Sequence, residues 1–233
     1  VHFDNIEVVN VPWSTAYWFY MWDCDFPKIT NCRCINTVLQ GRDAYQFKGC
    51  RDWLIENNYA TLFNYYGVDD HDSTNRAGYR NIIRNNILIN NARGIDAQQS
   101  YSIVEWNIIE LELSTIEGID IRWTWISISI VNNHITYDKI SSWAWAWWIS
   151  DFYCTAIADR NLVISWNIIE NASANWIQIY KSKKSVISNN VIKNSWQATS
   201  ATKKYGIFMN DSITDNVITW NVCYDDQDDW TTS

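Results

Sequence analysis

A short motif that recurs along the chain constrains its fold more than any other feature. In each copy, an apolar residue lies three residues before an asparagine and another lies two residues after it, as in Ile83, Asn86 and Leu88. Successive copies are separated by 21, 26, 34, 23 and 31 residues, so strands of constant length must be joined by loops of variable length. The flanking positions are mostly β-branched, which is typical of buried strands. The repeat asparagines are Asn86, Asn107, Asn133, Asn167, Asn190 and Asn221.

A second signature lies between these motifs, where a small residue precedes an alternating strand. It is written Gly94-Ile95-Asp96-Ala97 in one repeat and Gly118-Ile119-Asp120-Ile121 in the next. Two or three short strands per repeat describe one coil of a parallel β-helix. A side-chain amide at each bend can pair backbone groups that the bend leaves unpaired. No long segment has the 3.6-residue period of a helix, so we predict an all-β solenoid.

These repeats resemble the right-handed parallel β-helix superfamily, the pectate-lyase-like group. The resemblance is clear over residues 79–224 and implies an all-β, single-stranded, right-handed parallel β-helix. We expect one such domain over residues 1–233, with less regular coils in residues 1–78 and an acidic tail at 225–233. Because the chain starts at Val1 rather than Met, we expect it to be a fragment of a longer protein.

The composition is unusual, with 16 Trp against seven Gly. Trp106, Trp166 and Trp220 stand immediately before a repeat asparagine, where other repeats carry Asn, and Trp148 and Trp176 occupy the glycine slot. Asparagine and glycine tolerate positive φ at a turn, whereas tryptophan does not. We therefore interpret these tryptophans as glycines of the natural product, encoded by UGA, which some bacterial lineages read as glycine. The alternative is an aromatic ladder that stacks on sugars.

The charge balance limits the partners. The chain has 18 Lys+Arg and 26 Asp+Glu, for a net charge of −8, which opposes nucleic-acid binding. No apolar run is long enough to span a bilayer and no signal peptide is present, so we expect no membrane insertion. The negative charge also disfavours an anionic substrate unless Ca²⁺ or a local basic patch assists. An extracellular or cell-surface location is expected for a protein of this kind.

Stacking of coils predicts columns of outward side chains that could form a site. Asp96 over Asp120 would pair two carboxylates, able to hold Ca²⁺ or to share a proton. The next column would hold Gln98, Arg122 and Tyr180, and Arg122 could neutralise a substrate carboxylate. We therefore predict Asp120, Gln98, Arg122 and Tyr180 as substrate-binding residues. The alternative is an ordinary solvated polar column.

A second candidate is the segment Tyr66-Gly67-Val68-Asp69-Asp70-His71-Asp72, which precedes the first clear repeat. It offers a phenol, an imidazole and three carboxylates, which could supply the base and the acid that remove and return a proton next to a uronate carboxylate. Asp70 and Asp72 are candidate Ca²⁺ ligands. The alternative is a polar, acidic loop in which His71 has no special role.

This segment resembles the Tyr-Gly-x-Asp-x-His motif of mannuronan (alginate) C5-epimerases. The resemblance implies that Tyr66 and His71 form the acid/base pair and that Asp69 is a supporting carboxylate. The family's further Asp aligns with Gln98 here, with Asp96 two residues away, and we predict Asp96 as a catalytic residue. The expected function is a uronate lyase or C5-epimerase acting on an acidic polysaccharide. The alternative is a non-catalytic module that binds glycans or serves a structural role.

Overall fold

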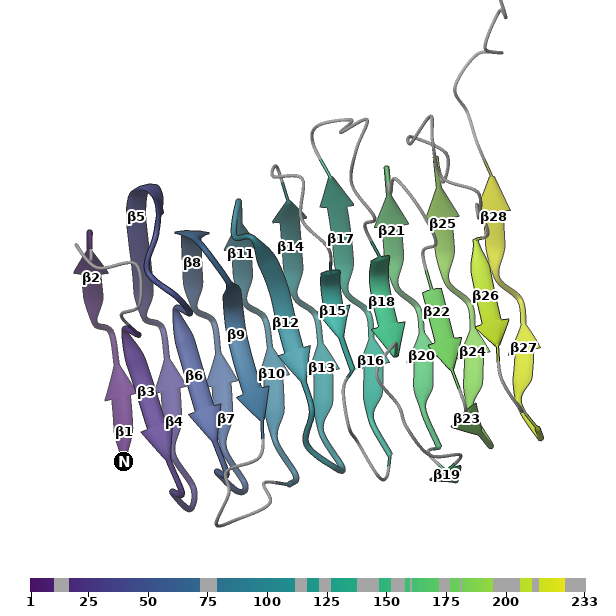
Figure 1. The fold of residues 1–233 in the computed structure, drawn as a ribbon, viewed down its shortest axis with the longest axis horizontal. Coiled ribbons are helices and arrows are strands. Elements are labelled where there is room, and N and C mark those ends of the chain that lie inside the picture. Colours follow the sequence, from purple (N-terminus) through teal and green to yellow (C-terminus); the bar gives the residue numbers. More distant parts are fainter. Residues whose placement is uncertain are drawn as a thin grey trace, which may run out of the picture.

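Three parallel β-sheets wind along one axis in the computed structural model (Figure 1). All named strands pair in parallel with the equivalent strand one coil away, and no helix occurs among the residues described. This confirms an all-β solenoid. The structure describes residues 1–10, 17–71, 79–111, 117–121, 127–137, 147–151, 158–159, 161–171, 177–180, 182–194, 206–210 and 214–224.

Each sheet takes one strand from each coil. Sheet A contains β1 (His2–Asp4), β4 (Lys28–Thr30), β7 (Leu54–Glu56), β10 (Ile82–Arg84), β13 (Ile103–Glu105), β16 (Ser129–Val131), β20 (Val163–Ser165), β24 (Val186–Ser188) and β27 (Val217–Thr219). Sheet B contains β2 (Glu7–Val9), β5 (Arg33–Gln40), β8 (Tyr59–Phe63), β11 (Ile87–Ile89), β14 (Ile108–Leu111), β17 (His134–Tyr137), β21 (Ile168–Glu170), β25 (Val191–Lys193) and β28 (Val222–Tyr224).

Sheet C forms the third face and carries the predicted site segments. It contains β3 (Phe19–Trp22), β6 (Tyr45–Lys48), β9 (Tyr66–His71), β12 (Arg93–Ala97), β15 (Glu117–Asp120), β18 (Trp147–Asp151), β22 (Ile177–Tyr180) and β26 (Ile207–Asn210). Two further short strands, β19 (Ala158–Asp159) and β23 (Ser182–Lys183), pair with each other. No helix among the described residues has the length and apolar character needed to cross a membrane.

The core is built from the apolar positions that flank each repeat asparagine. In sheet A, Ile83 pairs with Val104 and Val104 with Ile130, and all three side chains are fully buried. Each apolar side chain therefore packs on its equivalents in the adjacent coils, which removes a continuous stripe of apolar surface from water. The first coils, which were expected to be less regular, contribute β1 to β9 to the same three sheets.

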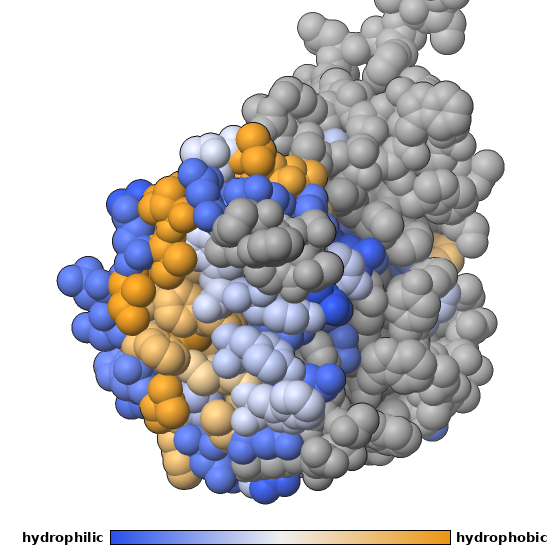
Figure 2. Space-filling view, turned by 60° about the vertical axis from the view of Figure 1, so that its left-hand side comes forward, coloured by the Kyte–Doolittle hydropathy of each residue, from blue (hydrophilic) through white to orange (hydrophobic). Residues whose placement is uncertain are grey.

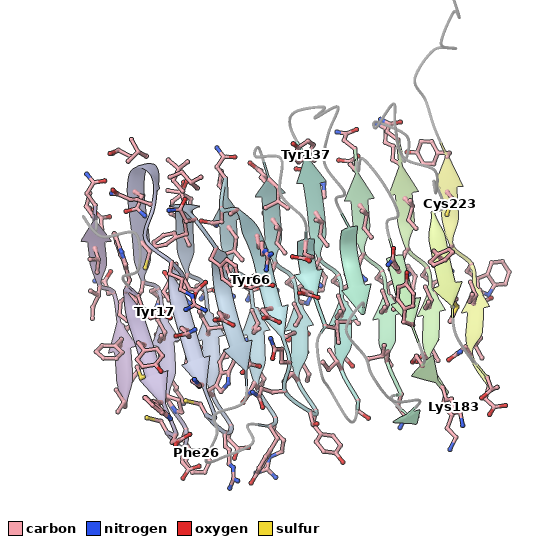
Figure 3. All side chains as sticks on the ribbon, in the orientation of Figure 1. Tyr17, Phe26, Tyr66, Tyr137, Lys183 and Cys223 are labelled. Atoms are coloured by element: carbon pink, nitrogen blue, oxygen red, sulfur yellow. The ribbon has the colours of Figure 1, made fainter. Side chains whose placement is uncertain are left out.

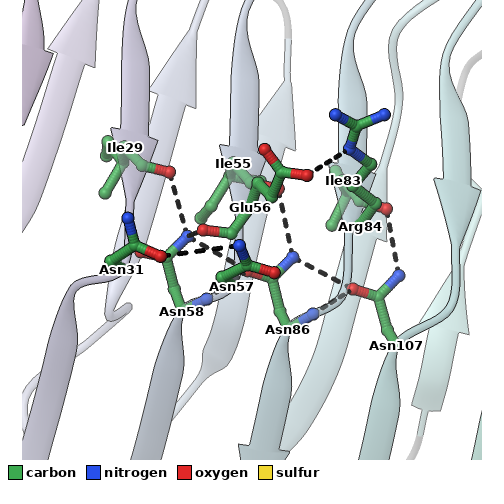
Figure 4. Close-up of polar contacts among 10 residues, drawn as sticks. All are labelled: Ile29, Asn31, Ile55, Glu56, Asn57, Asn58, Ile83, Arg84, Asn86 and Asn107. Carbon is green, nitrogen blue, oxygen red and sulfur yellow. Dashed lines mark hydrogen bonds and ion pairs between the residues drawn. The ribbon is translucent and has the colours of Figure 1, made fainter. Parts of the chain in front are cut away.

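The repeat asparagines form a hydrogen-bonded ladder between sheets A and B (Figure 4). The backbone N–H and the Nδ2 of Asn107 both donate to Oδ1 of Asn133, at 3.0 and 2.9 Å, and Nδ2 also donates to the carbonyl of Ile83 at 3.0 Å. Each bend of this ladder thus satisfies its buried amide groups through the next coil, as predicted. The ladder begins at Cys32, whose N–H donates to Oδ1 of Asn58 at 2.8 Å.

The residue before each ladder asparagine lies in the left-handed region of φ. Asn85 and Asn132 have φ of 55° and 58°, and Trp106, Trp166 and Trp220 have φ of 57°, 59° and 55°. These three indoles are 59–82% exposed, so no packing compensates for the unfavourable backbone. The structure confirms that these tryptophans occupy turn positions suited to glycine or asparagine.

The glycine slot at the start of the sheet C strands is equally restrictive. A Cβ at Gly94 would lie 2.2 Å from the carbonyl oxygen of Gly118 on the next coil. Because Ile119 pairs with Ile149, the preceding residues Gly118 and Trp148 lie opposite each other. Trp148 therefore occupies the glycine slot, as predicted. Trp176 lies outside the described residues.

Candidate functional site

Three aspartates stand in register on the outer face of sheet C. Asp69 pairs with Asp96, and Asp96 with Asp120, on consecutive strands β9, β12 and β15. We call these three residues the carboxylate row. The strands alternate, so the preceding residue of each points into the core, and the aspartates themselves are only 1–2% exposed. The structure confirms the predicted stacking of Asp96 over Asp120 and extends it to Asp69.

A second outward column lies three residues before the carboxylate row, across the glycine bend. Its central member is Tyr66, whose hydroxyl donates to Oδ2 of Asp120 at 3.0 Å and accepts from Nη1 of Arg93 at 3.1 Å. Nε of Arg93 lies 3.1 Å from Oε2 of the buried Glu117. Figure 3 shows Tyr66 near the middle of this face. One phenol and one guanidinium therefore tie two acidic side chains together.

Tyr66 is held as a neutral phenol by its surroundings. Burial raises its pKa far above the ordinary value, and the negative charges of Asp96, Asp120 and Glu117 raise it further, against the opposing effect of Arg93. Its hydroxyl therefore keeps its proton and serves as a hydrogen-bond donor to the carboxylate row. This differs from a tyrosine poised to ionise.

A second carboxyl shares the environment of Asp69. Burial and the nearby charge of Asp69 raise the pKa of Asp43 to about 8. Gln46 donates from Nε2 to Oδ2 of Asp69 at 2.5 Å, and the backbone N–H of Tyr66 donates to Oδ1 of Asp43 at 2.9 Å. Asp43 therefore retains its proton near neutral pH.

The retained proton predicts a pH dependence of stability that Asp43→Asn removes. Between its ordinary value of 3.8 and about 8, the folded chain binds a proton that the unfolded chain lacks, so the free energy of unfolding falls as pH rises through this window. In Asp43→Asn this slope should be shallower by up to about 1.4 kcal/mol per pH unit. Urea unfolding at several pH values measures the slope.

Two outcomes of that series decide the assignment. Glu110→Gln, on the outer face of sheet B, should keep the wild-type slope because it lies away from the pair. Parallel stability curves for Asp43→Asn and the wild type would contradict a shared proton on Asp43.

The other predicted residues are placed as follows. Gln98 donates from Nε2 to Oδ2 of Asp96 at 2.6 Å, so it joins the site. Asp70 instead lies in the inward column between Phe47 and Ala97, is fully buried, and accepts from Nδ2 of Asn81 at 3.3 Å.

No contact among the described residues brings the remaining predicted residues to the carboxylate row. Tyr180 lies on β22, where its hydroxyl accepts from Nε2 of Gln178 at 3.0 Å. His71 ends β9, with its backbone opposite Lys48, and its side chain is not described. Arg122 and Asp72 lie outside the described residues. An acid/base pair of Tyr66 and His71 therefore stays a prediction.

The described carboxylates do not fit a Ca²⁺ site. Among the residues whose side chains the structure describes, no group of three His, Cys, Asp or Glu residues is arranged to hold a metal ion. One carboxylate oxygen of each member of the row already accepts a hydrogen bond. The donors are Gln46 to Asp69, Gln98 to Asp96 and Tyr66 to Asp120. We therefore derive no catalytic step through Ca²⁺.

Sequence reasoning missed the second column. Each member of this column lies three residues before a residue of the column that contains the carboxylate row. The members are Asp43, Tyr66, Arg93 and Glu117, which precede Gln46, Asp69, Asp96 and Asp120. This constant offset across the bend is the signal that identifies them. This offset is hard to see in the sequence because the four residues of the second column are of different types.

Comparison with known proteins shows the fold and no family. No family model matches the chain, and no curated protein matches it either. Among solved structures, the catalytic domain of Agl-KA is similar, with a TM-score of 0.55 and 16% identity, covering 95% of this chain. The chain spans about half of that domain, 47% of its length. At this identity the likeness supports the shared fold alone.

Proposed function

We propose that this chain is a carbohydrate-active β-helix enzyme that cleaves glycosidic bonds by acid–base catalysis at the outer face of sheet C. The observation that carries the proposal is the carboxylate row, Asp69, Asp96 and Asp120, in register on three adjacent coils beside a retained proton. An acidic glycan-processing site of this kind would belong outside the cell or on its surface.

The proposed chemistry needs a protonated carboxyl next to an ionised carboxylate. Glycoside hydrolysis requires one protonated carboxyl, which delivers a proton to the leaving oxygen, and one carboxylate, which activates water or attacks the sugar. The proton is held on Asp43, whose pKa is raised to about 8 by burial and by the neighbouring charge of Asp69, and we assign Asp43 as the acid. Asp96 receives a donated hydrogen bond from Gln98, which favours its charged form, and we assign it as the base or nucleophile.

Charge favours a neutral glycan as substrate. The site gathers Glu117 and the three carboxylates of the row, whereas Asp43 keeps its proton. Arg93 is already engaged by Glu117 and Tyr66, and Nε of Arg42 lies 3.6 Å from Oδ2 of Asp43. A polyuronate would be repelled by this excess of negative charge. Binding of a neutral sugar costs no such repulsion, and carboxylates accept hydrogen bonds from its hydroxyls.

A uronate lyase or C5-epimerase is the second candidate, favoured by one observation. The neutral hydroxyl of Tyr66 is fixed in the site and could donate a proton at C5, with His71 as the base and Arg122 bound to the substrate carboxylate. Tyr180 and Asp120 would then contact the sugar chain. This candidate requires His71 and Arg122 to reach the row.

A panel of substrates separates these candidates. The chain would be incubated with neutral glucans and xylan and with alginate and pectate, each with Ca²⁺ or a chelator. We expect new reducing ends on a neutral glycan, without ultraviolet absorbance of an unsaturated product, in either condition. Unsaturated products or deuterium exchange at C5 on a uronate would favour the second candidate. Binding without any turnover would indicate a non-catalytic glycan-binding module.

A further inference from the structure

An exposed aromatic cluster extends the outer face of sheet C beyond the site. β3 is the edge strand of this sheet and pairs with β6 so that Tyr20 faces Gln46 and Trp22 faces Lys48. Gln46 in turn pairs with Asp69. Tyr20 is therefore the first residue of the column that contains the carboxylate row, two coils, or about 10 Å, from Asp69.

The outward orientation of these rings follows from strand alternation. Phe19 and Met21 point into the core and are 6% and 5% exposed, whereas Tyr20 and Trp22 are 40% and 50% exposed. Their exposure thus comes from facing outward, and a coil added before β3 would pack beside them without covering the outer face. Figure 2 views the molecule with this N-terminal end turned forward.

Neighbouring side chains hold the rings in place. Tyr17 stacks on Tyr20 with ring centroids 5.2 Å apart, and Trp22 meets Tyr20 edge-on at 6.1 Å. The guanidinium of Arg42 lies 5.4 Å from the centre of the Tyr17 ring, and Nζ of Lys48 lies 5.4 Å from that of Trp22. The result is an ordered apolar surface with two cationic donors beside it, which we call the aromatic platform (Tyr17, Tyr20 and Trp22).

We propose that the aromatic platform is a glycan subsite that binds a neutral sugar of the same chain whose bond is cleaved at the carboxylate row. The apolar face of a pyranose packs on exposed aromatic rings, and Arg42 and Lys48 can donate hydrogen bonds to its hydroxyls. The glycan then runs along the solenoid axis, across the strands of sheet C. This inference rests on the proposed function for the identity of the ligand.

The test measures binding separately from turnover. Binding of a long neutral glycan and of a short oligosaccharide would be measured by calorimetry on Asp96→Asn, with and without the double change Tyr20→Ala and Trp22→Ala. We expect the double change to weaken binding of the long glycan about tenfold and leave the short oligosaccharide unaffected. Tyr101→Ala, which removes a 52% exposed ring outside the platform, should change neither.

The outcomes distinguish the platform from the catalytic proposal. Weaker long-glycan binding in the double variant supports the platform even where no substrate is turned over. Undiminished binding overturns the platform even where the enzyme is active. Tyr20→Phe with Trp22→Phe, which keeps the rings, should retain binding, and its failure to do so would also overturn it. Sedimentation that shows wild-type dimers, absent in the double variant, would make this surface an interface between copies instead.

Discussion

Replacing Asp96 by asparagine is expected to lower kcat on a neutral glycan by about 10²–10⁴-fold. The substitution preserves shape, and the amide oxygen can still accept the hydrogen bond from Gln98 at 2.6 Å. It removes the central negative charge of the row, which no other residue supplies at that position. Initial rates of reducing-end formation, with thermal unfolding to show that the variant is folded, measure the effect.

Glu110→Gln is the matched control for this loss of charge. Glu110 lies on β14, with its side chain exposed on the outer face of sheet B. It should retain the wild-type kcat. Equal rates for Asp96→Asn and the wild type would remove Asp96 from the mechanism, and an equal loss in Glu110→Gln would show a general effect of charge.

The largest effects on stability should come from tryptophans, with opposite signs at different sites. Changing Trp106, Trp166 and Trp220 to glycine should each raise the free energy of unfolding by about 1 kcal/mol, because glycine adopts positive φ without steric cost. One coil separates each of these turns from the next, so they lie about 10 Å apart and do not touch, and the gains should add to about 3 kcal/mol. Urea unfolding of the single and triple variants measures them.

Trp53→Gly provides the contrast. This indole is 1% exposed and stacks on Phe47 with ring centroids 3.9 Å apart. Its removal should lower the free energy of unfolding by at least about 3–5 kcal/mol. A destabilised triple glycine variant would contradict the assignment of the turn positions.

The same contrast predicts the coding sequence. We expect UGA at the codons of Trp106, Trp166 and Trp220 and UGG at that of Trp53, and mass spectrometry of the protein from its source should find glycine at the first three positions. UGG codons at all four would mean that the natural chain carries strained indoles.

The repeat made the scaffold predictable from sequence. Ile83, Asn86 and Leu88 and their equivalents specify two strands and a bend, and stacking of identical bends then follows from the need to pair buried amides. The register of Asp96 with Asp120 follows from the same alignment, because each coil repeats the strand after its glycine.

The side-chain network of the site was less predictable. Tyr66 reaches across two coils to Asp120, a distance that no local motif encodes. Asp69 and Asp70 were both predicted as site residues, as a supporting carboxylate and a Ca²⁺ ligand, yet the alternation of β9 places Asp70 in the core column and Asp69 on the outer face. Composition indicates an acidic segment, but only the strand phase decides which carboxyl lies in the carboxylate row and which lies in the core column.

Digestion in water enriched in ¹⁸O tests the central claim most directly. Hydrolysis at the carboxylate row transfers one water oxygen to the new reducing end, while the fragment on the other side of the cleaved bond keeps the glycosidic oxygen. Mass spectrometry should therefore find one ¹⁸O at each new reducing end formed by the wild-type chain, and far less labelled product from Asp96→Asn. Products that carry no label, or labelled products formed equally by Asp96→Asn, would contradict hydrolysis by these residues.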